Sequence, residues 1–267
     1  MSSPAKRQIR TFIISCTVFF LPVFLFWGCS FRKPDAGTES FKPQNSALIL
    51  PFIEQYNSVT GFHSTGKISV KGWVLGKSAG IFMAGTKDPM RIKIEITHSW
   101  GKPVLHILID RDRLEILDYN DKKAYSGEFS PEGLSDYFPG SGFSEEMLWG
   151  VFRGLPDLSI FEKGEYRAPG KVRLTKKDGS AVSLIEFSQE GSSPDEISLK
   201  YGDLSIKFSD FSEIDNTRFA GKVKIEDVLN SKDLILTRNK IVFNRKIPDE
   251  VFSVEIPNNF ERLSLYQ

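Results

Sequence analysis

The residue types that most often carry catalysis are sparse in this chain and form no recognisable site. The three histidines, His63, His98 and His106, lie in separate strand or turn contexts without the spacing of a metal site. Neither a Gly-x-Ser-x-Gly elbow nor a His-Glu-x-x-His helix occurs. We therefore expect no catalytic residue, no metal and no cofactor. Three functions are weighed below, and the weakest of them is a hydrolase whose active site is not marked by any motif.

The paired carboxylates have structural explanations. Asp110 and Asp112 flank a predicted turn, where an aspartate side chain can accept hydrogen bonds from nearby backbone N–H groups. Glu145 and Glu146 come at a predicted helix start, where negative charge interacts favourably with the helix dipole. Neither pair therefore requires general acid–base chemistry to account for it.

Cysteine is the residue type whose position does indicate chemistry. The chain has two, Cys16 and Cys29, and Cys29 follows a basic start, an apolar run over residues 12–27, and Gly28. This order is typical of a secretory signal that ends at a lipid-modified cysteine. We predict a signal peptide over residues 1–28, with a diacylglyceryl group on the Cys29 thiol and a palmitate-type chain on its amine. Two or three acyl chains anchor a protein firmly, because each buried CH₂ contributes roughly 0.8 kcal/mol.

The four residues Phe26, Trp27, Gly28 and Cys29 resemble the lipobox of bacterial lipoproteins, with a fit at the last two positions and bulkier residues at the first two. The alternative is a transmembrane anchor, although the apolar run is shorter than the ~20 residues of a spanning helix and contains Pro22. In both cases the basic residues precede the apolar run and should stay inside. The remainder of the chain is therefore expected outside the cytoplasmic membrane.

The chain after the signal is nearly neutral and has no free thiol. Removal of residues 1–28 takes away three positive charges and leaves 32 Lys and Arg against 34 Asp and Glu. This balance excludes the basic footprint of a nucleic-acid-binding protein. With Cys29 lipidated, no disulfide can form, so the domain must be held together by its apolar core. We expect a flexible linker over residues 29–46 and a single monomeric domain over residues 47–267.

Apolar spacing predicts one helix followed by a long series of strands. Over residues 47–59 the apolar residues recur every three or four positions, which is typical of an amphipathic helix. After Gly61 the period changes to two, with turn signals every eight to twelve residues. The alternating apolar residues are Ile68 and Val70; Ile92, Ile94 and Ile96; Leu105, Ile107 and Ile109; Val172 and Leu174; Val182 and Leu184; Ile197, Leu199 and Tyr201; Leu204, Ile206 and Phe208; Val223 and Ile225; Leu234 and Leu236; Ile241 and Phe243.

This pattern predicts a mainly β protein of about eleven antiparallel strands with one apolar face each. The chain has too few helices to cover such a sheet by layering, so we expect a curved, unclosed β-barrel with the apolar residues on its concave face. A helical insert over residues 130–158 interrupts the strands, with one helix start at Ser130-Pro131 and another at Ser144-Glu145. Helices this short need an apolar surface to dock on, and the mouth of the barrel offers one.

The insert is the predicted lid of a ligand cavity. Its second helix carries apolar residues on more than one face, so some of them are expected to touch ligand. The tryptophans Trp73, Trp100 and Trp149 can line a cavity, contact a membrane interface or fill the core, and for a single tryptophan core or partial burial is favoured. The candidate ligand-binding residues are Met147, Leu148, Trp149 and Phe152 in the lid and Ile92, Ile94, Leu105 and Ile107 on the strands.

Taken together, these features resemble the lipoprotein-carrier superfamily of LolA and LolB. The resemblance rests on the lipidated cysteine, the helix before the first strand, the strand motif Thr65–Val70, the helical insert, and the closing unit Ile247-Pro248-Asp249-Glu250-Val251-Phe252-Ser253-Val254. The closing unit also resembles less characterised domain families placed beside them. The similarity covers most of residues 47–256.

The resemblance implies an unclosed barrel with a hydrophobic cavity for the acyl chains of lipoproteins or other envelope lipids. The anchored form is similar to LolB, an outer-membrane lipoprotein that accepts cargo from a soluble periplasmic carrier. Ser30, after the lipidated cysteine, is not the aspartate associated with retention at the inner membrane. The resemblance therefore implies a non-enzymatic protein of the outer membrane that faces the periplasm. The alternative is a non-catalytic lipoprotein subunit or scaffold of an envelope complex, with a filled interior.

Overall fold

The computed structural model describes residues 40–41, 47–71, 78–138, 143–187 and 193–265. The chain divides into two units, Met1–Asp35 and Ala36–Gln267, and the description below concerns the second. The predicted signal peptide, Cys29 and Trp73 lie outside the described residues. Within the described part, no helix combines the length and the apolar character needed to cross a membrane.

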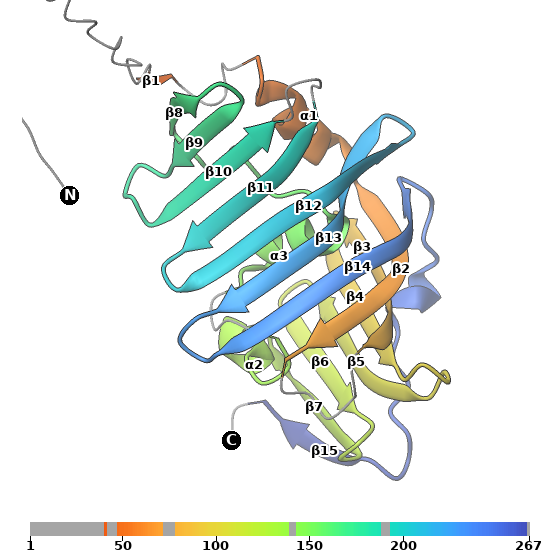
Figure 1. Cartoon of the computed structure of the whole chain (residues 1–267). Helices are drawn as coiled ribbons and strands as arrows, with labels where there is room; N and C mark the ends of the chain where they lie inside the picture. Colours follow the sequence, from red (N-terminus) through yellow and green to blue (C-terminus); the bar gives the residue numbers. More distant parts are fainter. Residues whose placement is uncertain (1–39, 42–46, 72–77, 139–142, 188–192, 266–267) are drawn as a thin grey trace, which may run out of the picture. The chain divides into compact units, whose positions relative to one another are not determined.

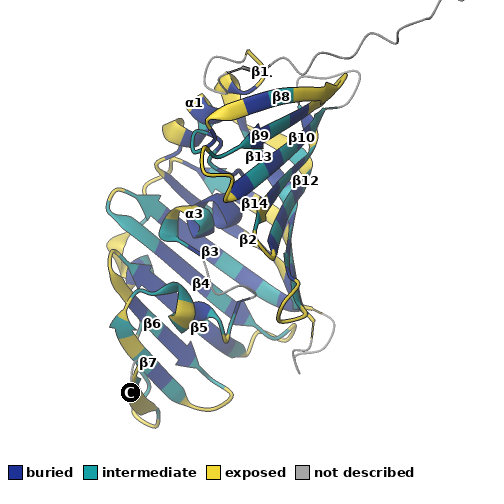
Figure 2. Cartoon of the chain, turned by 90° about the vertical axis from the view of Figure 1, so that its left-hand side faces the viewer, coloured by how far each residue is buried: buried dark blue, intermediate teal, exposed yellow. Residues whose placement is uncertain are grey.

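The described residues form one sheet of fifteen strands in the order β1-β8-β9-β10-β11-β12-β13-β14-β2-β3-β4-β5-β6-β7-β15. All pairs are antiparallel except β7 and β15. The sheet is curved and unclosed, which confirms the predicted architecture (Figures 1 and 2). The strands are β1 (Ser40–Phe41), β2 (Gly61–Val70), β3 (Ala79–Lys87), β4 (Met90–Thr97), β5 (Pro103–Asp110), β6 (Arg113–Asp118), β7 (Lys123–Glu128), β8 (Lys163–Ala168), β9 (Lys171–Thr175), β10 (Ala181–Phe187), β11 (Pro194–Tyr201), β12 (Leu204–Ile214), β13 (Thr217–Asp227), β14 (Lys232–Phe243) and β15 (Glu261–Ser264).

The strand count exceeds the predicted eleven because some strands lack a simple alternation. In β3 both faces are covered, so Met83 and Ala84 are adjacent and equally buried and the period-two signal disappears. Conversely, the two strands predicted at Leu234 and Ile241 are one strand, β14. The pairing of β14 with β2 shifts register between Arg238 and Lys240. Even-numbered residues such as Leu236 therefore face inward before the shift, and odd-numbered residues such as Ile241 face inward after it.

The prediction that Val182 and Leu184 are the inward-facing residues of β10 is wrong. Ala181, Ser183 and Ile185 point to the buried face, whereas Val182 and Leu184 are half-buried on the other face. The reason is that alternate residues share a face, so burying Val182 and Leu184 would also bury the carboxylate of Glu186. In the structure Glu186 instead forms an ion pair with Lys171 on the neighbouring strand, at 2.8 Å.

Three helices occupy the inner face: α1 (Leu50–Ser58), α2 (Pro131–Leu134) and α3 (Glu145–Arg153). The Ser144 hydroxyl accepts a hydrogen bond from the backbone N–H of Met147 and caps α3, which ends at Gly154 with a φ of 89°. That left-handed conformation favours glycine at the end of a helix. Figure 2 shows α3 against the inner face, in front of β3. The predicted helical insert is therefore present, and it sits inside the curve of the sheet.

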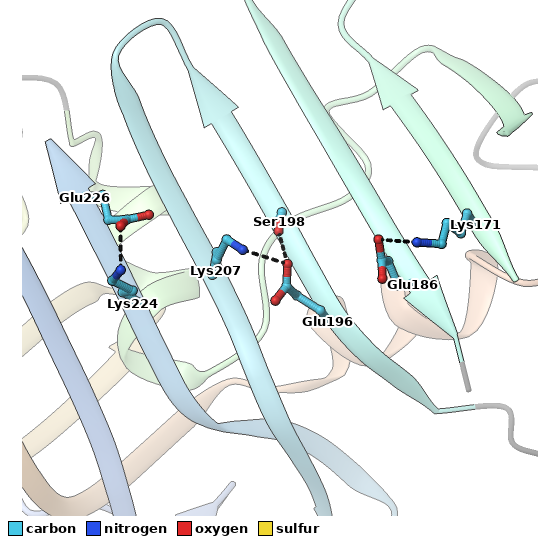
Figure 3. A network of polar contacts seen from close by, with 7 residues as sticks. All are labelled: Lys171, Glu186, Glu196, Ser198, Lys207, Lys224 and Glu226. Carbon is cyan, nitrogen blue, oxygen red and sulfur yellow. Dashed lines mark hydrogen bonds and ion pairs between the residues drawn. The ribbon is translucent and has the colours of Figure 1, made fainter. Parts of the chain in front are cut away.

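The outer face differs between the two halves of the sheet. Over β3 to β5 it is partly covered by the C-terminal segment, in which the 3₁₀ helix η2 (Asp249–Phe252) packs Phe252 against Ala84 and Leu108 and Asp249 forms an ion pair with Arg91 of β4. The closing unit of the sequence is thus a cover for the sheet. Over β9 to β13 the outer face carries ion pairs, which Figure 3 shows: Lys171 with Glu186, Lys207 with Glu196, and Lys224 with Glu226. Pairs this exposed contribute at most about 1 kcal/mol each.

Candidate functional site

A cavity of about 270 Å³ lies between α3, the segment after it, and strands β11 and β12. Its walls combine apolar side chains with a smaller set of polar ones, as in many small-molecule sites. The apolar lining is Met147, Val151, Pro156, Ile160, Leu199, Ile206 and Phe208. The polar lining is Ser144, Glu146, Asp157, Lys176 and Tyr201.

The strands and the helix present these side chains for simple reasons. Leu199, Ile206 and Phe208 are inward residues of two paired strands, with Leu199 directly opposite Ile206. On α3, Met147 and Val151 are four residues apart and therefore share one face. Asp157 accepts hydrogen bonds from the N–H and hydroxyl of Ser159, which fixes the turn that closes the other side.

Two of the polar lining residues, Asp157 and Lys176, lie near Tyr201. Burial, and to a lesser extent the carboxylate of Asp157, raise the pKa of Tyr201 to about 12, so the phenol is neutral at physiological pH. The Lys176 ammonium lies 6.0 Å from the centre of its ring. The cavity therefore combines an apolar lining with polar side chains that include one cation, Lys176, and the carboxylates of Glu146 and Asp157.

Of the four predicted lid residues, Met147 lines this cavity and the other three face away from it. Leu148, Trp149 and Phe152 are at most 2 % exposed. The Trp149 ring meets Phe62 of β2 edge-on, with ring centres 5.2 Å apart. These three side chains pack α3 onto the sheet, while the opposite face of the same helix borders the cavity.

The four predicted strand residues also lie in the packed core. Ile92, Ile94, Leu105 and Ile107 face inward on β4 and β5, are at most 3 % exposed and do not line the cavity. The structure thus brings Met147 together with residues of β11 and β12. Those residues were predicted from the sequence as inward-facing strand residues but not as part of a ligand site. One feature of the sequence indicates that α3 has two contact surfaces, one toward the core and one toward the cavity: the helix is apolar on more than one face.

Two buried arginines hold α3 in place. Arg238 on β14 donates to the carbonyl oxygens of Ala220 at 2.7 Å, Phe152 at 3.1 Å and Val151. Arg153 donates to the carbonyl oxygen of Gln55 in α1 at 2.9 Å.

Burial is the main reason why the pKa falls to about 10 for Arg153 and to about 9 for Arg238, where the charge of Arg153 adds to the effect. Both guanidinium groups remain cations at neutral pH. The Nε and Nη1 groups of Arg153 have no hydrogen-bond partner, and neither has Nε of Arg238. The hydrogen-bond acceptors of these two cations are carbonyl oxygens, and the Arg153 guanidinium also lies 5.5 Å from the centre of the Tyr56 ring.

The histidines and carboxylates form no metal site in the described part of the chain, where no group of three or more potential ligands occurs. His106 points to the outer face, as its alternation predicts, and stacks edge-on against Tyr119 with ring centres 5.0 Å apart. Burial lowers the pKa of His106. Packing thus accounts for His106.

No model of a known protein family matches the chain, and no curated protein matches its sequence. Among solved structures, the chain is similar to a DUF1329 family protein from Desulfovibrio piger, with 12 % identity and a TM-score of 0.53 over 80 % of this chain and 98 % of that protein. This likeness establishes a shared fold: an open, curved antiparallel sheet.

Two further matches have TM-scores of 0.48. One is a putative outer membrane lipoprotein-sorting protein domain from Vibrio parahaemolyticus, at 10 % identity over 77 % of this chain and 94 % of that one. The other is a LolA superfamily protein from Nitrosomonas europaea, at 12 % identity over 80 % and 98 %. The architecture itself agrees with the one implied by the LolA/LolB-like resemblance.

Proposed function

We propose that this chain is a lipid-anchored protein of the outer membrane that binds an acyl chain of a lipoprotein, or of another envelope lipid, in the cavity between α3 and β11–β12. The observation that carries the proposal is the apolar lining of that cavity, which also includes the polar residues Lys176, Tyr201 and Asp157. An acyl chain fits such a lining because each buried CH₂ contributes about 0.8 kcal/mol, while the polar lining residues can meet a head group. The role is LolB-like and non-catalytic, with a soluble periplasmic carrier as the donor.

The size of the cavity limits what it can hold. At about 270 Å³ it lies just below the roughly 300 to 1,000 Å³ of typical ligand pockets. It therefore suits part of one acyl chain, and several chains would require α3 to move. Because Leu148, Trp149 and Phe152 pack the rest of α3 onto the sheet, such a movement would expose core.

That dense packing also supports a second candidate function, a lipoprotein subunit or scaffold of an envelope complex. Seven of the eight predicted ligand-binding residues are at most 3 % exposed and lie away from the cavity. A scaffold needs no access to the interior. The two functions therefore differ in whether lipid enters the cavity in the cell.

The cavity can be tested by filling it. We expect Leu199→Trp to occupy the space with its larger side chain and to reduce lipid contact about tenfold, which corresponds to roughly 1.4 kcal/mol of lost binding free energy. Cells would be fed a fatty acid that carries a photoreactive diazirine, and the full-length chain would be illuminated in the membrane, purified and mapped by peptide mass spectrometry. Label is expected on the peptides of Met147, Leu199 and Phe208.

Leu184→Trp is the matched control, since it makes the same change on the outer face of the neighbouring strand β10. It should leave the labelling pattern intact. Absence of label from the α3 and β11–β12 peptides in the wild-type chain would refute acyl-chain binding and leave the scaffold.

The anchor is tested separately by Cys29→Ala. Without the thiol no diacylglyceryl group can be attached, so the unprocessed precursor is expected to accumulate, held by its signal segment. Mass spectrometry of the membrane fraction measures the outcome. A mature, membrane-bound variant that differs from wild type only by the side-chain mass would contradict the predicted lipidation.

A further inference from the structure

The side chains that line the cavity between α3 and β11–β12 differ in exposure according to their polarity. Most of the apolar lining residues are buried: Val151, Pro156, Leu199, Ile206 and Phe208. Every polar lining residue is half-buried or exposed: Ser144, Glu146, Asp157, Lys176 and Tyr201. The interior of the cavity is therefore apolar, and the polar groups lie nearer to solvent at its opening. A molecule with an apolar tail and a polar head matches this gradient.

The charged side chains of the lining have both signs and are not paired with one another. Lys176 is the cation, and Glu146 and Asp157 are the carboxylates. Asp157 accepts both hydrogen bonds from Ser159 with Oδ1, and none of the three charged side chains forms an ion pair within the described part of the chain. On the outer face of the neighbouring strands, by contrast, lysine and glutamate side chains do pair (Figure 3). Charges kept apart in one cavity can each meet an opposite charge of a ligand.

Tyr201 lies within reach of both kinds of charge. The Lys176 ammonium is 6.0 Å from the centre of its ring, and the charge of Asp157 adds to the effect of burial on the pKa of its phenol. The backbone N–H of Lys176 donates to the carbonyl oxygen of Ala181, which is paired with Tyr201, so Lys176 and Tyr201 lie at the same end of their strands. The neutral phenol can donate a hydrogen bond to an anionic oxygen that also meets Lys176.

The two carboxylates act on a common neighbour, Tyr56 of α1. Burial raises the pKa of Tyr56, and the charges of Asp157 and Glu146 raise it further, whereas the charge of Arg153 opposes them. Arg153 does not line the cavity and donates its hydrogen bond to α1. Among the lining residues, two carboxylates thus stand against the single ammonium of Lys176.

These charges distinguish between lipid head groups. A head group with negative charge alone would place that charge near Glu146 and Asp157 as well as near Lys176. A head group without charge would leave all three side chains without an opposite charge. A phosphate joined to a primary ammonium satisfies both signs. Its phosphate oxygens can accept hydrogen bonds from Lys176 and Tyr201, and its ammonium can donate to the two carboxylates.

We infer that the cavity selects a zwitterionic phospholipid whose head group joins a phosphate to a primary ammonium, as in phosphatidylethanolamine. This selection rests on the proposed acyl-chain binding, which it narrows from envelope lipids in general to one class. The cavity of about 270 Å³ takes part of one acyl chain in its apolar interior. The head group then lies at the opening, where Lys176, Tyr201, Asp157 and Glu146 are accessible.

The test compares two lipids that differ only in their head groups. The full-length chain would be reconstituted into vesicles of equal parts phosphatidylethanolamine and phosphatidylglycerol, of which one at a time carries a photoreactive diazirine on an acyl chain. After illumination, the label is mapped by peptide mass spectrometry. We expect phosphatidylethanolamine to label the peptides of Leu199 and Phe208 about fivefold more than phosphatidylglycerol does, a ratio of the size that one partly exposed ion pair supplies.

Variants of the charged lining residues assign the preference. Lys176→Gln should lower labelling by phosphatidylethanolamine. Lys177→Gln is the matched control, because it makes the same change at the next residue, which is exposed and does not line the cavity, and it should leave labelling unchanged. Glu146→Gln combined with Asp157→Asn should bring the ratio of the two lipids close to one. Asparagine retains an oxygen that can accept the hydrogen bonds of Ser159, so the turn should persist.

The outcomes separate this selection from the binding on which it rests. Equal labelling of the cavity peptides by the two lipids, or stronger labelling by phosphatidylglycerol, would overturn the selection and leave acyl-chain binding in place. A preference for phosphatidylethanolamine that persists in the variants of Lys176, Glu146 and Asp157 would also overturn it. Absence of label from both lipids on these peptides would refute the proposed function and this selection together.

Discussion

Replacing Gly66 with alanine is expected to lower the free energy of unfolding by about 3 kcal/mol or more. Gly66 lies in β2 opposite Arg238, where β14 shifts register. A Cβ atom at this position would overlap the carbonyl oxygen of Thr237 and lie 3.2 Å from Cα of Arg238. Both contacts are with backbone, so no side chain can rotate away and the strands would have to separate at the centre of the sheet.

Gly61→Ala is the matched control, because it makes the same change in the same strand. There the new Cβ would meet the carbonyl oxygen of Gly85 at 3.4 Å, an ordinary contact, and we expect a change within about 1 kcal/mol. Urea unfolding of the full-length chain in mild detergent, followed by tryptophan fluorescence, compares the two variants. Similar midpoints for both would show that the β14–β2 pairing can absorb a methyl group.

The strands and their inward-facing residues were predicted well from the sequence where one face of the sheet is buried and the other is exposed to solvent. The isoleucines of β4 and the inward residues of β11 to β13 alternate clearly, and all lie inside as expected. Prediction failed at β3, where the C-terminal segment covers the second face, because that cover comes from a segment more than 150 residues away. Local spacing carries no information on such a contact.

The candidate site was harder to predict than the fold, because an apolar side chain looks the same in a packed core and in a cavity wall. Trp149 and Met147 are two residues apart on α3, yet Trp149 meets Phe62 in the core and Met147 lines the cavity. Which face of α3 meets which strand depends on how the insert docks. Arg238 fixes how α3 docks, through its hydrogen bonds to the last turn of the helix. Its position in β14, two residues after Leu236 in the alternating apolar pattern, does not predict this structural role.

Replacing Arg238 with methionine is expected to cost about 3 kcal/mol or more and to loosen α3. Methionine would remove a buried charge and its repulsion with Arg153, which favours folding. The change would also leave the carbonyl oxygens of Val151, Phe152 and Ala220 without their donor, and each buried unsatisfied group costs about 1–3 kcal/mol. Three lost partners outweigh the relief of one charge, and two of the three belong to the last turn of α3.

Arg153→Met provides the contrast, because this arginine is also buried but donates one hydrogen bond, to Gln55, packs over the Tyr56 ring, and has two N–H groups without a partner. Replacing a poorly satisfied buried ion with an apolar side chain is often neutral or stabilising, so we expect a smaller loss of stability than for Arg238→Met, or a gain. Hydrogen exchange of the α3 amides should accelerate in Arg238→Met and stay slow in Arg153→Met. If both variants destabilise equally, burial of the cation itself, rather than the carbonyl oxygens it serves, holds α3 on the sheet.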